Sequence, residues 1–184
     1  DINKSIKKAE EILGEFAIFY ENNWISNMCQ KLGIENHKKT DKVLIEGFLD
    51  LLHKQELDFN NSFYSLSILL KNDKIIKEKS PKNLQILSKI KSSDWYQKWK
   101  DRLSLENRDH KDCIKILLES NPSIIPRNHL VEKILNQVIE TNNKKVLTDY
   151  LIELTNPKKI RSFDDPFTFS PLPNEEVTQT FCGT

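Results

Sequence analysis

The sequence contains few glycines, and they do not cluster. Only four occur among 184 residues, and no two are close enough to form a loop whose backbone N–H groups could surround a phosphate. We therefore do not expect the chain to hold ATP by a glycine-rich loop. No apolar run approaches the roughly 18–20 residues that cross a bilayer, and the first residues do not form a signal peptide. These absences predict no membrane contact.

Cysteine and net charge are also scarce. The three cysteines are widely spaced, without a CxxC pair or a zinc-like spacing to the four histidines. This usage is typical of a reducing compartment, so we predict a cytoplasmic protein without a metal site. Lys and Arg number 28 against 27 Asp and Glu, which leaves a formal charge of +1 with the signs interspersed. That balance predicts no binding of nucleic acid, because no extended basic field is present.

What the sequence does contain is the three-to-four-residue apolar spacing of helices. Charged residues make up 30% and hydrophobic residues 38%, a composition that favours helices with one buried and one wet face. We predict an all-α fold of about seven or eight helices. The expected ranges are 1–32, either continuous or broken at 21–23, then 41–52, 60–70, 81–90, 94–103, 109–120, 128–141 and 144–154.

The first expected helix carries a row of apolar residues spaced by three or four, which predicts an apolar face. Gly33 followed by Ile34 is expected to end this helix. Because the sequence starts inside the helical pattern, we expect further polypeptide upstream. The row consists of Ile6, Ala9, Leu13, Phe16, Tyr20, Trp24, Met28 and Leu32.

The residues after position 156 lose the helical spacing. Pro166, Pro171 and Pro173 are interleaved there with Phe163, Phe167 and Phe169. We therefore predict two parts: a helical domain over 1–156 and an extended tail over 157–184 that lies on a surface with its phenylalanines as anchors. At about 3.3 Å per residue, the tail could extend on the order of 80 Å from its start.

Five residues are candidates for a functional role. Arg127 and Asn128 follow a rigid proline, and they either cap a helix and form an ion pair or contact a ligand. Trp95 and Trp99 are one helical turn apart and are expected to pack in a core or an interface, because no basic patch accompanies them for base stacking. Cys182 stands near the end of the tail, where an accessible thiol with an ordinary pKa of about 8.5 is available for chemistry without being activated. A free terminal thiol without function is the alternative.

Four segments together resemble one known family. The most distinctive is NPSIIPRNHLVE at 121–132, followed by WYQKWKDRL at 95–103 and FCGT at 181–184. The residues from 24 to 63 add weaker matches, among them an Asp58-Phe59 pair that we otherwise interpret as a loop before a helix. The segments resemble the C-terminal region of the selenoprotein O family, also called the YdiU family. Its members are kinase-like proteins that transfer AMP from ATP to hydroxyl side chains of other proteins.

The resemblance implies that this chain is the helical C-terminal part of a protein adenylyltransferase and is not an enzyme alone. ATP and Mg would be held by an N-terminal kinase-like portion that this sequence does not contain. That portion and the parent's protein substrates are the implied partners. The resemblance also implies a redox role for Cys182 through pairing with a cysteine of the catalytic portion, although Cys-Gly-Thr replaces the Cys-Ser-Ser of many relatives.

Two functions follow as hypotheses. The first is an accessory domain that packs on and supports the catalytic portion, while the tail offers Cys182 as a redox latch. The alternative is a helical scaffold that recruits the protein substrate and has no catalytic or redox role.

Overall fold

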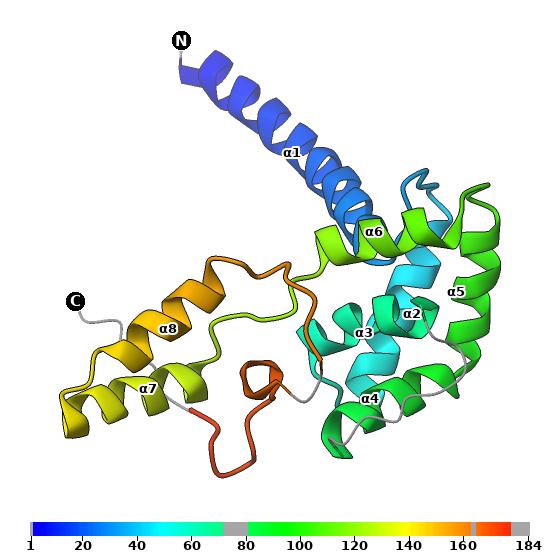
Figure 1. Ribbon diagram of the computed structural model, residues 1–184. Coiled ribbons are helices and arrows are strands. Elements are labelled where there is room, and N and C mark those ends of the chain that lie inside the picture. The colour runs from blue at the N-terminus through cyan, green and yellow to red at the C-terminus, as the bar shows by residue number, and fades with distance from the viewer. Residues whose placement is uncertain (1, 72–80, 163–164, 178–184) are drawn as a thin grey trace.

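The computed structural model describes residues 2–71, 81–162 and 165–177 (Figure 1). Within these ranges the chain forms eight α-helices, one short 3-10 helix and no strand, so the predicted all-α fold is confirmed. The first helix runs unbroken through 21–23. The helices are α1 (Ile2–Lys31), α2 (Asp41–Lys54), α3 (Phe59–Lys71), α4 (Pro81–Lys91), α5 (Asp94–Ser104), α6 (His110–Ser120), α7 (Asn128–Thr141), α8 (Lys145–Leu154) and η1 (Pro166–Thr168).

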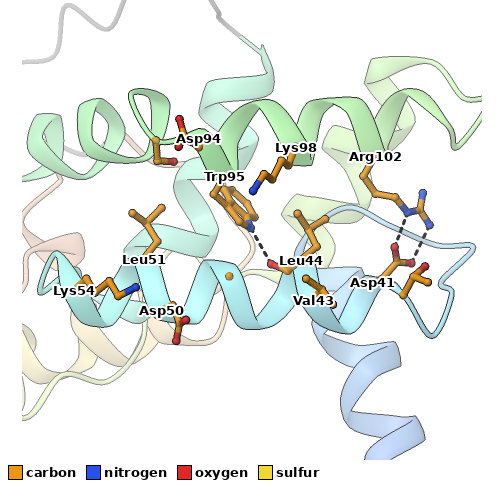
Figure 2. A pocket seen from close by; sticks show the side chains of 13 residues that line it. Asp41, Val43, Leu44, Asp50, Leu51, Lys54, Asp94, Trp95, Lys98 and Arg102 are labelled. Atoms are coloured by element: carbon orange, nitrogen blue, oxygen red, sulfur yellow. Dashed lines mark hydrogen bonds and ion pairs between the residues drawn. The ribbon is translucent and has the colours of Figure 1, made fainter.

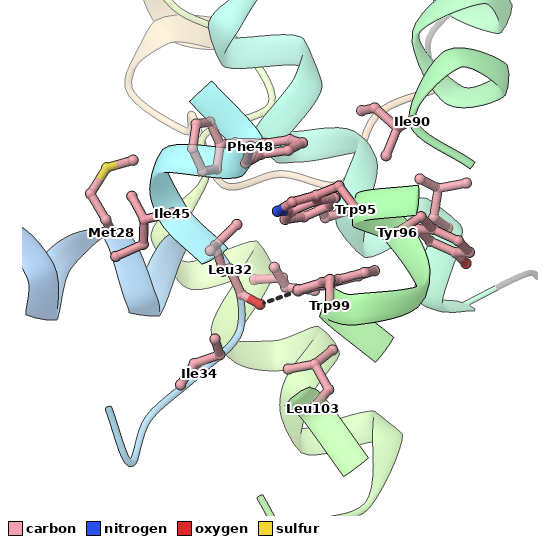
Figure 3. Packing of buried hydrophobic residues seen from close by; sticks show 14 of the residues in the cluster. Met28, Leu32, Ile34, Ile45, Phe48, Ile90, Trp95, Tyr96, Trp99 and Leu103 are labelled. Atoms are coloured by element: carbon pink, nitrogen blue, oxygen red, sulfur yellow. Dashed lines mark hydrogen bonds between the residues drawn. The ribbon is translucent and has the colours of Figure 1, made fainter. Parts of the chain in front are cut away.

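The hydrophobic core lies among α2 to α6 and the last turns of α1 (Figure 3). Trp99 is fully buried at its centre, and its indole Nε1–H donates to the carbonyl oxygen of Leu32 at 2.8 Å. The Trp95 ring stacks on Trp99 with 5.8 Å between centroids and on Phe48 with 4.2 Å. These aromatic contacts fix α5 against α2 and the end of α1, because large rings bury much apolar area and pack in defined orientations.

Gly33 ends α1 in a left-handed conformation with φ of +77°. Its N–H donates to the Gln30 oxygen at 2.9 Å, and the Ile34 N–H donates to the Cys29 oxygen at 2.9 Å. These two bonds form a Schellman motif, as the sequence predicts. A Cβ at position 33 would lie 3.0 Å from Cγ of Leu117 on α6. Glycine is therefore required both for the turn and for the close packing of α6.

Only the last turns of α1 join this core, and the rest of the helix projects from the body (Figure 1). Residues 2–23 are exposed on every side of the helix. Ile18, for example, is 66% exposed, although it lies at nearly the same angle round the helix as the buried Ile25, seven residues later. The exposure of Phe16 therefore follows from the projection of α1 beyond the body.

The remaining helices, α7 and α8, pack on each other as a hairpin beside the body (Figure 1). The chain that follows them is attached to α3. The Tyr64 hydroxyl donates to the Arg161 oxygen and accepts from the Arg161 N–H, both at 2.9 Å. Asn61 Nδ2 donates to the Thr168 oxygen at 2.8 Å. The division of the chain at 156/157 stays a prediction.

Candidate functional site

An open groove of about 600 Å³ lies between α2 and α5 (Figure 2). Its floor is formed by Trp95, which is 7% exposed and whose Nε1–H donates to the Leu44 oxygen at 2.8 Å. A Cβ on Gly47 would lie 3.3 Å from Cδ1 of Trp95. Glycine at this position therefore allows the indole to pack closely against α2. Both tryptophans of the predicted pair belong to the hydrophobic core, but Trp95 also borders the groove, whereas Trp99 is fully buried.

The groove has apolar walls and a charged rim. Val43 on α2 is 74% exposed, and Leu51 lies half-buried further along the same helix. Asp50 and Lys54 from α2 and Asp94 and Lys98 from α5 also line it (Figure 2). An apolar strip with charges of both signs at its edge is suited to a short segment of another protein, because interfaces combine an apolar centre with a polar rim.

A buried ion-pair network closes one end of the groove. Arg102 Nε donates to Asp41 Oδ1 at 2.7 Å, and Arg102 Nη1 donates to Glu106 Oε1 at 2.7 Å. The other Glu106 oxygen accepts from the backbone N–H of Asn36 at 3.1 Å. Burial alone would raise the pKa of Asp41 and Glu106, but these hydrogen bonds lower both below their usual values. The network fixes α5 to the loop after α1.

Arg127 forms a second buried corner, with partners on α3 and the loop before it. Its Nη1 donates to Asp58 Oδ2 at 2.7 Å and its Nη2 donates to Asp58 Oδ1 at 2.9 Å. The same Nη2 donates to Asn61 Oδ1 at 3.1 Å. The Arg127 and Asp58 side chains are 8% and 19% exposed. Burial would raise the pKa of Asp58, but the guanidinium of Arg127 and the Asn61 N–H lower it below its usual value.

The corner satisfies most of the guanidinium from within the chain. The Arg127 Nε is buried and has no hydrogen-bond partner among the described residues. Asn128 is the first residue of α7, and the preceding N-cap, Arg127, makes no side-chain cap hydrogen bond. The sequence left open whether Arg127 forms an ion pair or contacts a ligand, and the structure shows the ion pair with Asp58. A ligand that binds the two Nη atoms of Arg127 in the same way would have to displace the Asp58 carboxylate.

Sequence reasoning missed the Asp58 and Asn61 side of this corner. The sequence indicates only a loop before a helix at Asp58, yet this residue is the bidentate partner of Arg127. The two residues stand 69 positions apart, and no local pattern links them. The available signal was the rule that a buried guanidinium needs an acidic partner, which predicts that such a partner exists without identifying it.

The cysteines divide into two groups. Cys29 and Cys113 are buried free thiols, and burial raises the pKa of Cys29 to about 12 and also raises the pKa of Cys113. Because the thiolate is the reactive form, both are protected from chemistry. Cys182 lies outside the described residues. No group of three or more His, Cys, Asp or Glu side chains that could hold a metal occurs within 2–71, 81–162 and 165–177.

Alkylation of the native chain is expected to modify Cys182 at least about tenfold faster than Cys29 or Cys113, because only thiolates that the reagent reaches will react. Peptide mass mapping after a timed iodoacetamide pulse measures the three rates. Unfolding in urea before the pulse is the control and should make the rates similar. Rapid native labelling of Cys29 would contradict its burial.

Comparison with known proteins places these features in a family. A family model for protein adenylyltransferase SelO matches residues 2–155. A protein nucleotidyltransferase YdiU from Clostridium botulinum (strain Okra / Type B1) is 32% identical over 182 residues, which cover 99% of this chain and 35% of that relative. Another from Bacillus cereus (strain G9842) is 30% identical over 184 residues and is covered to 36%.

The chain thus spans about a third of the length of the curated relatives it matches. No described helix is both long enough and apolar enough to cross a membrane. The resemblance carried by residues 121–132 and 95–103 is confirmed by the match over 2–155. This chain belongs to the protein adenylyltransferase SelO family.

Proposed function

We propose that this chain is the helical accessory part of a protein adenylyltransferase that transfers AMP from ATP to hydroxyl side chains of other proteins. The observation that carries the proposal is the family match over 2–155 combined with the 35% share of the relative's length. The kinase-like catalytic portion would lie in the remaining length. The helices of this chain pack on that portion and hold it in its active arrangement.

ATP and Mg²⁺ belong to the catalytic portion in this proposal. The described residues of this chain do not fit either group. The buried guanidinium of Arg127 is already paired with Asp58. No group of three or more His, Cys, Asp or Glu side chains that could hold a metal occurs within the described ranges. We therefore derive no step of the transfer from residues of this chain.

The test compares this chain with the whole protein. Each is incubated with ATP labelled in the AMP moiety, Mg²⁺ and a general protein substrate. The whole protein is expected to label the substrate, whereas this chain alone gives no label above a boiled control. Label transfer by this chain alone would contradict the proposal, and so would a whole protein that fails to transfer AMP.

We further propose that Cys182 is a redox latch toward the catalytic portion. In the oxidised state its thiol and a cysteine of that portion form a disulfide, losing two protons and two electrons to a peroxide-class oxidant, which is reduced. Cys29 and Cys113 are buried, so neither of them is available for this role. A disulfide at Cys182 should appear in non-reducing mass mapping of the oxidised whole protein. If Cys182→Ser leaves AMP transfer equally sensitive to oxidant, the latch is wrong.

The α2–α5 groove favours the alternative, a scaffold that recruits the protein substrate. Val43 projects at its edge and is mostly exposed, so Val43→Asp should place a charge in the apolar strip without disturbing the core. Ser88→Asp on the exposed side of α4 adds the same charge elsewhere. Loss of substrate binding in the whole protein with Val43→Asp alone, at unchanged melting temperature, favours recruitment. Equal binding by both variants excludes the groove.

A further inference from the structure

The projecting part of α1 carries an apolar stripe in which each residue is exposed by half or more. At 100° per residue, its members fall within an arc of about 80° on one side of the helix. The Phe16 and Tyr20 rings lie next to each other, with 6.2 Å between centroids. The stripe consists of Ile2, Ile6, Leu13, Phe16 and Tyr20, which are 78%, 50%, 69%, 60% and 61% exposed. Ile12 and Phe19, 58% and 66% exposed, flank it on one side.

The stripe is separate from the side of α1 that the body already uses. The residues that bury α1 against α2 and α6, namely Ile25, Met28 and Cys29, lie about 130° further round the helix. A partner on the stripe would therefore sit beside the body without displacing it. Most of the stability of a helix in a protein comes from tertiary packing of its apolar face. The projecting part of α1 consequently gains most of its stability from whatever covers the stripe.

The opposite side of the helix identifies the kind of partner. Lys4, Lys8, Glu11 and Glu15 are exposed there beside Ile18, and the four charges cancel. Helices that lie on membrane surfaces carry a strongly basic polar face, which this one lacks. The mixed face is typical of a helix that packs on protein and leaves its charged side in water.

We propose that the α1 stripe docks onto the catalytic portion of the same protein, an inference that rests on the function proposed above and identifies the surface. This chain spans 35% of a relative's length, so a partner of larger size than the chain itself belongs to the same polypeptide. Linkage in one chain gives an effective concentration on the order of millimolar, which favours this partner over a second copy.

The α7–α8 hairpin supports the same partner. It extends from the same side of the body as α1 in the view of Figure 1. Ile139 on α7 and Ile152 on α8 are 79% and 59% exposed. A domain of the catalytic portion's size can therefore contact both projecting elements at once, which a single short peptide would not do.

The test uses hydrogen exchange of the α1 amides in the whole protein and in this chain alone. Residues 5–20 are expected to exchange at least about tenfold more slowly in the whole protein, because docking adds to the free energy of local opening. The double substitution Leu13→Ser with Phe16→Ser should abolish this extra protection. Lys8→Ser with Glu15→Ser is the matched control on the polar side and should retain it.

Two kinds of result would overturn the docking surface, and one would instead reject the proposed function. Equal exchange in both proteins, while the whole protein still transfers AMP, rejects the docking surface and leaves the proposed function intact. Loss of AMP transfer in the unmodified whole protein rejects the function, and α1 protection is still read separately. A concentration-dependent dimer of this chain, or its sedimentation with phosphatidylserine vesicles, assigns the stripe to a second copy or to lipid if Leu13→Ser with Phe16→Ser abolishes it.

Discussion

Arg127→Ala is expected to lower the free energy of unfolding by about 3–5 kcal/mol, because removing one partner of a buried ion pair leaves the other charge uncompensated. Asp58 would lose both guanidinium hydrogen bonds, and Asn61 would lose the donor to its Oδ1. Urea unfolding followed by far-UV circular dichroism measures the change as a shift of the midpoint at constant slope. Asn128→Ala, at the neighbouring exposed position, is the control and should stay within about 0.5 kcal/mol.

The same pair predicts how stability depends on acid. The folded-state pKa of Asp58 is lowered, so its contribution is complete above the unfolded value of about 3.9 and is lost as pH falls through the lower folded value. Asp58→Asn should therefore lose stability less steeply than the unmodified chain below about pH 4. Combined with Arg127→Ala, it should cost less than the sum of the two single changes. Additive losses would show that the residues do not act as a pair.

Trp99→Ala is expected to cost about 3–5 kcal/mol, the range for removing a large aromatic side chain from a core. The indole is fully buried, stacks on Trp95 and donates to the Leu32 oxygen. Trp99→Phe retains much of the ring but leaves that oxygen without its donor, and should cost about 1–3 kcal/mol.

The control for this series is Lys98→Ala, an exposed neighbour on the same helix, which should change stability by less than about 0.5 kcal/mol. Circular dichroism is the appropriate probe because the substitution removes a fluorophore. A loss below about 1 kcal/mol for Trp99→Ala would contradict a central position in the core, since the range for such a deletion starts well above it.

Most helix bounds were predictable because they depend on local signals. Gly33 required only the recognition of a left-handed helix end, and the apolar spacing of α5 and α6 follows from the periodicity of a single helix. The position of the buried face of α1 was not predictable in the same way. Periodicity identifies which residues share a side of the helix but not how much of the helix projects beyond the body, and Ile18 is 66% exposed at nearly the same angle as the buried Ile25.

In the candidate site, too, only the residues with a local sequence signal could be predicted. Arg127 could be recognised as a candidate because a proline precedes it and a helix begins directly after it. Asp58 gave no local signal for a partner 69 positions away. The hydrogen bonds made by the buried polar side chains of α3 were equally unpredictable from the sequence. Asn61 and Tyr64 read as ordinary helix residues, and only the folded chain shows that they bind Thr168 and Arg161. Long-range polar pairing depends on the tertiary fold, which helical periodicity does not specify.

The attachment of the tail to α3 sets a radius for the thiol near its end. Asn61 on α3 donates to the Thr168 oxygen at 2.8 Å and to Ser170 Oγ at 3.4 Å, so the chain is held by α3 well beyond residue 157. Twelve peptide units separate Ser170 from Cys182. At about 3.3 Å each, they let the thiol reach roughly 40 Å from that attachment, about half the span of a tail released at residue 157. Any cysteine that forms a disulfide with it must come within that distance of the first turn of α3.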